Sequence, residues 1–342
     1  MHRRDLPANT ITPAHTNVIP WDAQQKAHKV IEGNIYFPHR WCALSRDGDY
    51  RELPFLLGDP MSGPMARFLS FPPGRESVRV NGKAYAHHHR TDTFRVALGP
   101  QPMQTRILGQ WLNHGDFVLR GANDVYVEKS GGRGAILLLV SADRRGYHPV
   151  YNAADREEAE STLDESASIV FGDNMPHFHE RDEDAISGPE TSFAALQAQQ
   201  PVLFGSMSDD KDWLRLSDGS SVGAVFMADP VSGTLILLSN NAPNALEAPA
   251  GHYQSDMVRL VLSGSCNVGD RTYSAGDFRF TRAGTDEGEI VHGPSGSTQI
   301  LIFGDRRGWL PQVSNGSPLE VCPRLTELAS MLEQYMAPEV RG

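Results

Sequence analysis

The segment HHHRTDTFRVAL (residues 87–98) returns in altered form as GHYQSDMVRLVL (residues 251–262). Both segments contain a histidine, an aspartate four positions later and an arginine three positions after the aspartate. This spacing makes equivalent pairs of His88 and His252, Asp92 and Asp256, and Arg95 and Arg259. A repeat of this kind indicates two related strands, one in each half of the chain.

Three further motifs repeat in the same order: DPxSG at residues 59–63 and 229–233, GDF at 115–117 and 276–278, and DRRG at 143–146 and 305–308. The offset between the copies is 170 at the first of these motifs and 161 at the second, which loops of different length explain. The repeats therefore predict two copies of one domain. With only two copies, a pair of closed domains is favoured over a solenoid.

The size and charge of the chain limit its class. A length of 342 residues predicts about two domains. A net charge of −11 disfavours nucleic acid and anionic membranes as partners, because both attract basic surfaces. The sequence has no run of about 18 apolar residues, and its first residues lack the apolar core of a signal peptide.

The three cysteines, Cys42, Cys266 and Cys322, are widely spaced and form no CxxC motif. This pattern is typical of free thiols in a reducing compartment. We therefore expect a soluble, cytoplasmic protein.

Short apolar runs bounded by Gly, Pro, Asn or Asp predict β-strands. These runs are about five residues long and recur at roughly ten-residue intervals, as in a sandwich or barrel. The expected strands are 66–71, 93–98, 117–119 and 135–140 in the first copy, and 223–227, 234–238, 257–262, 278–281 and 299–303 in the second.

The remaining composition predicts the domain boundaries: an N-terminal arm at 1–30, a first barrel at 31–150, an acidic connector at 151–200, a second barrel at 201–316 and a helix at 317–342. Pro323 suits a first helical turn. Apolar residues such as Leu325, Leu328 and Leu332 then recur at helical spacing. Such a stripe is typical of packing, or of the face of a homodimer.

These repeated motifs resemble the two motifs of the cupin superfamily, G-x5-H-x-H-x3/4-E-x6-G and G-x5-P-x-G-x2-H-x3-N. The resemblance covers both copies, and it implies an all-β fold of two tandem double-stranded β-helix barrels, a bicupin, with a C-terminal helix. In this family, three histidines and one glutamate usually bind one divalent metal inside the barrel. In the second motif, Tyr126 of the first copy and Glu287 of the second stand in the histidine position.

The first motif fits in two registers, and a slip of one residue exchanges the two faces of a strand. One register places His88 and Asp92, and likewise His252 and Asp256, in the ligand positions. We prefer it because it keeps the histidine and the aspartate on one face in both copies. It also sends the apolar residues 94, 96 and 98, and 258, 260 and 262, into the barrels. The other reads His87-x-His89-x3-Thr93 in the first copy and Gly251-x-Tyr253-x3-Met257 in the second.

Neither copy contains the full ligand set of the family. By resemblance, the second copy offers His252, Asp256 and Glu287 as metal ligands, with Gln254 nearby. About three protein ligands with open positions are needed for such a site, so Fe, Mn, Ni or Zn is a candidate cofactor. The first copy offers His88, Asp92 and Tyr126, helped by His87 or His89.

Several polar residues allow two interpretations. Arg95 and Arg259 bind a substrate carboxylate if the second register points them into the barrels, and otherwise form salt bridges with Asp92 and Asp256. The DRRG motif indicates a turn or an interdomain ion pair. His177, His179 and Glu180 in the connector indicate a solvated linker patch rather than a ligand cluster.

The resemblance implies an enzyme that acts on a small organic molecule in a barrel pocket, and a metal-dependent dioxygenase or lyase is our leading hypothesis. The catalytic candidates are His252, Glu287 and His88. The substrate-binding candidates are Arg259, Arg95, Tyr126 and Gln254, and the second copy is favoured as the active one because it offers more carboxylates. The alternatives are a metal-free cyclase or isomerase, with His252 or Glu287 as general acid or base, and a non-catalytic small-molecule-binding bicupin.

Overall fold

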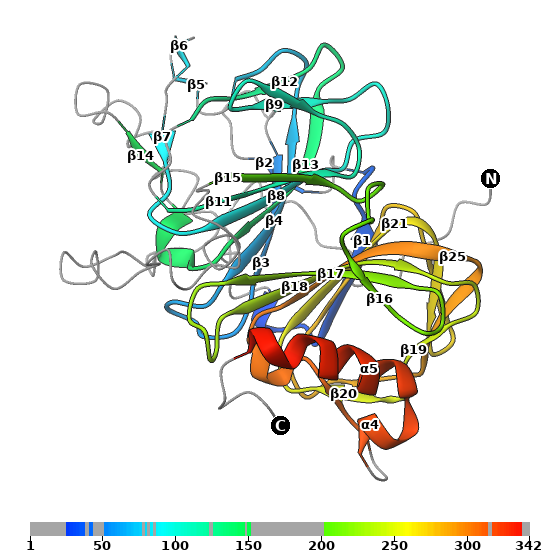
Figure 1. Ribbon diagram of the computed structural model, residues 1–342. Coiled ribbons are helices and arrows are strands. Elements are labelled where there is room, and N and C mark those ends of the chain that lie inside the picture. The colour runs from blue at the N-terminus through cyan, green and yellow to red at the C-terminus, as the bar shows by residue number, and fades with distance from the viewer. Residues whose placement is uncertain are drawn as a thin grey trace.

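The computed structural model describes residues 25–37, 41–43, 51–76, 79–80, 83–84, 87–122, 126–147, 149–151, 202–313 and 317–336. The predicted connector from 152 to 200, including the cluster around His177, lies outside the described residues. So does most of the predicted N-terminal arm. Figure 1 shows two β-rich bodies side by side, with the helical segment at the C-terminal end of the chain.

The first copy is built on a seven-stranded sheet with the order β15-β11-β8-β13-β4-β3-β2. Its strands from this half of the chain are β2 (Cys42–Ala43), β3 (Arg51–Leu56), β4 (Met65–Phe71), β8 (Thr93–Ala97), β11 (Asp116–Arg120) and β13 (Ala135–Ser141). Smaller sheets close the barrel with β9 (Thr105–Ile107), β10 (Gln110–Leu112), β12 (Glu128–Ser130), β7 (His87–His88), β14 (Val150–Tyr151), β5 (Arg79–Val80) and β6 (Lys83–Ala84).

The second copy repeats this arrangement in a nine-stranded sheet whose main path is β1-β23-β21-β25-β18-β17-β16. Its own strands are β16 (Leu214–Arg215), β17 (Ser221–Met227), β18 (Thr234–Asn241), β21 (Met257–Val268), β23 (Asp277–Thr281) and β25 (Ile290–Phe303), joined by β19 (Leu246–Ala248) and β22 (Arg271–Ser274). A small sheet adds β20 (Gly251–Tyr253), β24 (Asp286–Glu287) and β26 (Pro311–Gln312). Every strand expected from the sequence is therefore present, and the all-β fold is confirmed.

Each sheet is completed by a strand from the other half of the sequence. Strand β1 (Val30–Asn34) pairs antiparallel with β23 of the second copy, and β15 (Val202–Ser206) pairs antiparallel with β11 of the first. Both exchanged strands carry a glycine opposite a phenylalanine, Gly33 facing Phe278 and Gly205 facing Phe117. Strand pairing thus crosses the predicted domain boundaries in both directions, and the boundaries themselves stay a prediction.

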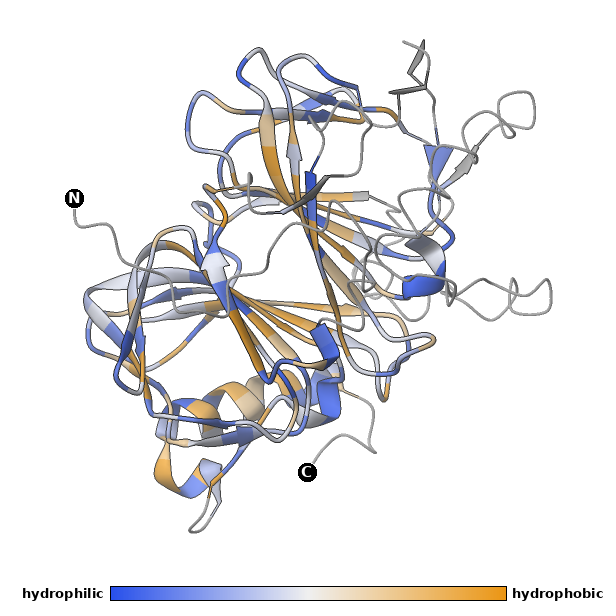
Figure 2. Ribbon diagram, turned by 180° about the vertical axis from the view of Figure 1, so that it is seen from behind, coloured by the Kyte–Doolittle hydropathy of each residue, from blue (hydrophilic) through white to orange (hydrophobic). Residues whose placement is uncertain are grey.

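The two large sheets pack against each other through one apolar core. Phe55 of the first copy contacts both Phe278 and Phe280 of the second with ring centroids 5.5 Å apart, and Phe68 lies 5.1 Å from Phe278. Two further cores lie inside the individual barrels, around Leu137 in the first copy and Leu301 in the second. Figure 2 shows the apolar strands running through the middle of both bodies.

The repeated DRRG motif holds the turn formed by the repeated DPxSG motif. In the second copy, the buried Arg306 donates to the carbonyl oxygens of Met227 (2.8 Å), Gly233 (3.2 Å), Pro230 (3.3 Å) and Thr234 (3.3 Å). A Cβ at Gly233 would clash with the carbonyl oxygens of Met227 and Asp229 and would lie 2.7 Å from the Arg306 Nη2, so only glycine fits this turn around the guanidinium. Arg144 occupies the same position in the first copy.

The ion pairs of this motif that the described residues show lie within the motif itself. Its second arginine pairs with the aspartate, Arg145 with Asp143 at 2.6 Å and Arg307 with Asp305. The turn interpretation is the correct one.

The C-terminal segment consists of α4 (Pro318–Val321), α5 (Pro323–Leu332) and the 3-10 turn η7 (Glu333–Tyr335). Leu325, Leu328 and Leu332 are buried and join the core of the second barrel. The apolar stripe is therefore a packing face within the chain. No helix among the described residues is long and apolar enough to cross a membrane.

Candidate functional site

The structure resolves the choice of register in the first motif. Phe94, Val96 and Leu98 belong to the core between the two sheets, together with residues such as Val258 and Leu260 of the other copy. Since neighbouring residues of a strand point to opposite faces, Thr93, Arg95 and Ala97 point into the first barrel. The register preferred from the sequence is therefore wrong, and the alternative one places the side chains correctly.

In the first barrel, this register brings together His87, His89 and Tyr126. The ring centroids of His87 and Tyr126 are 4.4 Å apart, those of His87 and His89 are 5.7 Å apart, and those of His89 and Tyr126 are 6.4 Å apart. An isolated bridge between His87 and Tyr126 holds the two backbone segments together. All three rings are buried.

Arg95 links Tyr126 to the strand that carries it. Its Nη1 donates to Thr93 Oγ1 at 2.9 Å, and its Nη2 donates to the Tyr126 hydroxyl. The guanidinium carbon lies 4.6 Å from the centroid of the Tyr126 ring. Two predicted substrate-binding residues, Arg95 and Tyr126, therefore do lie together.

Two further arginines reach the same place from neighbouring strands. Arg120 on β11 lies 3.8 Å from the Tyr126 ring centroid, and Arg67 on β4 lies 3.7 Å from the buried Glu52. A second buried acid, Glu128, is 3.9 Å from the Arg95 Nε. The first barrel thus contains three buried guanidinium groups, of which Arg95 and Arg120 lie over the Tyr126 ring and Arg67 lies 4.8 Å from the centroid of the Tyr147 ring.

The buried groups have altered protonation. Burial, followed by the charge of Arg95, holds the pKa of His89 well below its ordinary value, so the imidazole is neutral at pH 7. Burial raises the pKa of Tyr126 despite the nearby arginines, so its hydroxyl keeps its proton. Burial likewise raises the pKa of Glu128.

The tautomer of His89 follows from a backbone contact. Its Nδ1 lies 2.9 Å from the carbonyl oxygen of Gly146, which can only accept a hydrogen bond. The proton of the neutral ring is therefore on Nδ1, and Nε2 carries a lone pair. Gly146 belongs to the turn η2 (Arg144–Tyr147), so the repeated DRRG motif orients this histidine.

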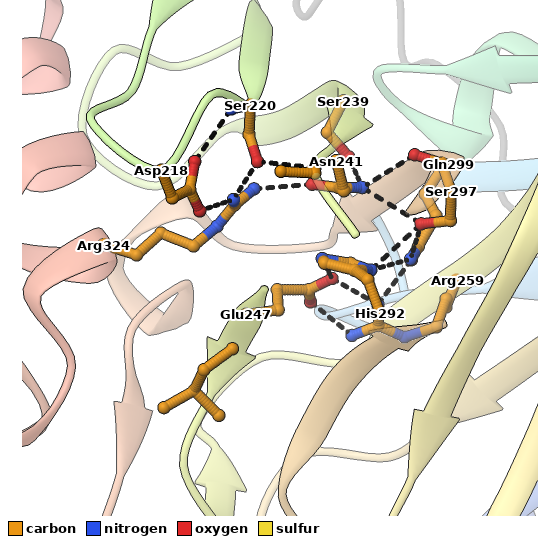
Figure 3. A network of polar contacts seen from close by, with 12 residues as sticks. Asp218, Ser220, Ser239, Asn241, Glu247, Arg259, His292, Ser297, Gln299 and Arg324 are labelled. Carbon is orange, nitrogen blue, oxygen red and sulfur yellow. Dashed lines mark hydrogen bonds and ion pairs between the residues drawn. The ribbon is translucent and has the colours of Figure 1, made fainter. Parts of the chain in front are cut away.

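The interior of the second barrel is a closed polar network (Figure 3). Glu247 accepts two hydrogen bonds from Arg259, at 2.7 and 2.9 Å, and the Arg259 Nη1 also donates to Gln299 Oε1 at 2.6 Å. Burial alone would raise the pKa of Glu247, but the charge and hydrogen bonds of Arg259 lower it to about 2. His292 lies 3.5 Å from Glu247, and burial lowers its pKa to about 4.

The C-terminal helix α5 supplies another member of this network. Arg324 donates to Asp218 (2.6 Å), Ser220 (2.6 Å) and Asn241 (2.5 Å), as Figure 3 shows. Between α5 and the barrel is a cavity of about 30 Å³, bordered by Glu247, Arg324 and apolar side chains such as Leu328. This volume suits about two water molecules.

The other predicted site residues do not come together. His252 is half-buried at the surface, 3.7 Å from the exposed Asp286. Asp256 accepts hydrogen bonds from the backbone of Gly58 (3.0 Å) and Ala283 (2.8 Å), which joins the two copies.

Glu287 points into the second barrel, where it accepts from Arg279 at 2.7 Å and Thr281 at 2.5 Å. Gln254 is exposed. His88 is half-buried and faces away from His87 and His89, because it alternates with them along the strand.

A divalent metal does not fit either barrel. In the first copy the ligand positions hold His87, His89, Thr93 and Tyr126, and the last two oxygens accept hydrogen bonds from the cationic Arg95. In the second copy they hold Gly251, Tyr253, Met257 and Glu287, without any nitrogen donor. Among the described residues, no group of three or more His, Cys, Asp or Glu is arranged to hold a metal. The predicted set of His252, Asp256 and Glu287 is not brought together.

Sequence reasoning missed several residues of these clusters. Arg67 and Arg120 lie on strands that were correctly expected, and their positions in the alternation of each strand could have revealed them as interior charges. Glu247, His292 and Arg324 gave no such signal, because they meet Arg259 only through contacts distant in sequence. Glu128 lies on a three-residue strand that was not expected.

No protein-family model matches the sequence, and no curated protein matches it. Solved structures do match. A candidate dioxygenase from Nostoc punctiforme PCC 73102 is 14% identical with a TM-score of 0.50, covering 84% of this chain and 86% of its own. YlbA from E. coli is 13% identical with a TM-score of 0.46, covering 89% and 97%.

Salicylate 1,2-dioxygenase from Pseudaminobacter salicylatoxidans is 10% identical with a TM-score of 0.46, covering 80% and 83%. At these identities the likeness concerns the fold alone. The duplicated barrels, the repeated motifs and the likeness to the candidate dioxygenase agree that the chain has the cupin fold in its two-barrel, bicupin form.

Proposed function

We propose that this bicupin is an enzyme that acts on a small organic molecule inside the first barrel by metal-free proton transfer, in an isomerase or lyase type of reaction. The observation that carries the proposal is the pair of His89 and Tyr126. Their surroundings make one a proton acceptor and the other a proton donor at neutral pH. Pairs of titratable groups with such opposed preferences are typical of acid–base sites.

His89 would serve as the general base. Its Nδ1–H is fixed on the Gly146 carbonyl, so Nε2 is the atom that accepts a proton from the substrate. The neutral ring needs no prior deprotonation at pH 7. A positioned base of this kind contributes roughly 10²- to 10⁴-fold to a rate.

Tyr126 would serve as the general acid. Its hydroxyl oxygen accepts a hydrogen bond from Arg95, which leaves the hydroxyl proton available for the substrate. When that proton leaves, the adjacent guanidinium stabilises the negative charge on the oxygen. This stabilisation is strong inside a barrel, because the apolar walls around Leu137 and Leu139 exclude water.

The first barrel therefore replaces the second as the favoured active one. In the second barrel the buried carboxylates are engaged by arginines: Glu287, a predicted catalytic residue, by Arg279, and Glu247 by Arg259. Metal-dependent dioxygenation loses support for the same chemical reason in both copies, since the ligand positions do not hold a suitable donor set.

Deuterium incorporation tests the proposal without a known substrate. The full chain is incubated in D2O with pyruvate, 2-oxobutyrate and the neutral ketone butanone, and loss of the protons next to each carbonyl is followed by NMR. We expect exchange above the buffer rate for at least one compound, with a loss of about 10²-fold or more in His89→Gln and Tyr126→Phe.

The matched control is His88→Gln, since His88 neighbours the base but faces the other side of the strand. Its exchange rate should equal that of the wild type. Loss of exchange on addition of EDTA, with recovery on addition of a divalent metal, would contradict the metal-free mechanism. Equal rates in the wild type and in both site variants would show that the pair is not an acid–base site.

A further inference from the structure

We infer that Arg95 binds a carboxylate group of the ligand, so that the molecules taken by the first barrel are small organic acids. This inference rests on the proposed function for its catalytic meaning but can be tested by binding alone. The argument comes from the duplication, because the second barrel shows a carboxylate on the equivalent arginine.

Arg95 and Arg259 occupy the same place in the two barrels. Arg95 on β8 lies opposite Leu139 of β13, and Arg259 on β21 lies opposite Leu301 of β25. Both side chains are buried in the interior of their barrel, 1% and 0% exposed. The two guanidinium groups therefore start from equivalent backbone positions.

Their partners differ. Arg259 is held by both oxygens of Glu247, the geometry in which guanidinium binds carboxylate most strongly. Arg95 hydrogen bonds only to the neutral oxygens of Thr93 and Tyr126. Its Nε has no hydrogen-bond partner among the described residues, and Glu128, the acid beside it, is 3.9 Å away.

The sequence shows why the first copy has no counterpart of Glu247. The offset between the two histidine segments is 164 residues (252 − 88), which aligns Glu247 with Lys83. Between Glu76 and Asp92 the first copy contains no acidic residue. The segment that supplies the internal carboxylate in the second barrel therefore cannot supply one in the first.

At two positions on neighbouring strands, the first barrel carries an arginine where the second carries an uncharged residue. On β4, Arg67 lies opposite Leu139 of β13. On β18, the residue that lies opposite Leu301 of β25 is Leu237. Arg120 is the last residue of β11, and Thr281 is the last residue of β23. The two residues pair in the same register with β8 and β21, respectively.

A carboxylate on Arg95 also suits the proposed chemistry. Arg95 donates to the Tyr126 hydroxyl, so a ligand held by this arginine lies beside the proposed general acid. Its neighbouring carbon atoms are then within reach of His89, whose ring centroid is 6.4 Å from that of Tyr126. Binding and proton transfer would thus occur at one place.

The test is calorimetric and uses four probes on the full chain: pyruvate and benzoate, and their neutral amides pyruvamide and benzamide. We expect at least one carboxylate to bind and its amide to bind at least about tenfold more weakly, because a hydrogen bond to a charged group is worth about twice a neutral one. Inorganic phosphate is the competing anion. Phosphate binding as tight as that of the carboxylates would overturn the assignment to organic acids.

The variant Arg95→Lys keeps the charge but loses the planar, two-pronged donor, so we expect at least about tenfold weaker carboxylate binding. Arg307→Lys is the matched control, since Arg307 pairs with Asp305 at the surface of the other copy, and it should bind as the wild type does. Unchanged binding in Arg95→Lys, or no binding of any carboxylate by the wild type, would overturn the inference.

If Arg95→Lys does not fold, the wild type still decides the question. Tyrosine labelled with 13C at Cζ gives an NMR signal for Tyr126, assigned by its absence in Tyr126→Phe, and a carboxylate on Arg95 must shift it. An unmoved signal at saturating ligand overturns the inference.

Failure of the inference and failure of the proposed function give different results. Carboxylate binding without deuterium exchange supports the inference and contradicts the acid–base function. Deuterium exchange of butanone without binding of any carboxylate supports the acid–base function and contradicts the inference.

Discussion

Gly33 lies directly opposite Phe278 in the pair of β1 and β23, and a Cβ on this glycine would come within 2.6 Å of the Phe278 Cζ. The phenylalanine ring covers the exchanged strand and cannot move away, because it also packs against Phe55 and Phe68. Gly205 and Phe117 repeat the arrangement in the other copy. Glycine is therefore required at this position of each exchanged strand because a side chain would clash with the phenylalanine ring. The requirement does not come from the backbone angles of the glycine.

The first prediction concerns this contact. Gly33→Val should lower the free energy of unfolding by about 1–3 kcal/mol, since it overpacks a filled core. Gly132→Val is the control, because a Cβ there meets no atom within 4 Å. Urea unfolding measures both. An equal stability of the two variants would show that β1 does not pack on the second barrel in solution.

The second prediction compares two adjacent arginines of the DRRG motif. Arg306→Met should destabilise the chain by about 3 kcal/mol or more, because several buried carbonyl oxygens lose their donor together. Arg307→Met removes only an exposed pair with Asp305 and should cost less than about 1 kcal/mol. Thermal unfolding of the two variants under one condition gives the difference. A similar loss of stability in both variants would show that the hydrogen bonds of Arg306 to the carbonyl oxygens of the DPxSG turn do not stabilise the fold.

The sequence predicted the fold well, because the repeated motifs lie at positions that the fold requires. Gly63 and Gly233 must be glycine to admit the buried arginines, and Asp59 and Asp229 cap the same turn. The strands were found because they are short, apolar and bounded by turns. The exchange of β1 and β15 was not found, since local pattern carries no information on which sheet a strand joins.

The site was harder to predict for a physical reason. Strand β8 is buried on both faces, so alternation of polar and apolar residues did not reveal the interior face. The more apolar face, with Phe94 and Val96, packs between the two copies, and the interior face carries the charge of Arg95. A duplicated protein with two face-to-face sheets reverses the usual rule that the more apolar face lines the barrel.

The third prediction concerns pH. Burial disfavours the charged form of the folded His292 ring and, with the charges of Arg324 and Arg259, lowers its pKa to about 4 against an ordinary value of 6.5. Below pH 6.5 the unfolded chain binds this proton first. Stability should therefore fall as the pH falls from 6.5 to 4, by about 3 kcal/mol for this residue at about 1.4 kcal/mol per pH unit.

Urea unfolding between pH 7 and pH 4 checks this slope. In His292→Gln, the slope of the free energy of unfolding against pH should decrease by the contribution of one proton. His89, whose pKa is also lowered by burial, should still make its own contribution to the slope. Glu247 acts in a separate window, since its folded pKa of about 2 lies below the ordinary 4.5 and its contribution is lost only as the pH falls through that range. An unchanged slope in His292→Gln would show that the folded ring titrates normally.

The fourth prediction tests whether the second barrel is structural. Arg259→Met alone leaves Glu247 as a buried charge without its main partner, and Glu247→Leu alone does the same to Arg259, so each should cost about 3–5 kcal/mol. The double variant removes both charges and should cost clearly less than the sum of the two single losses. Its deuterium exchange and carboxylate binding should equal those of the wild type, because the proposed site lies in the other barrel. If the double variant folds but loses both activities, the network around Glu247 and Arg259 takes part in function, and the assignment of chemistry to the first barrel fails.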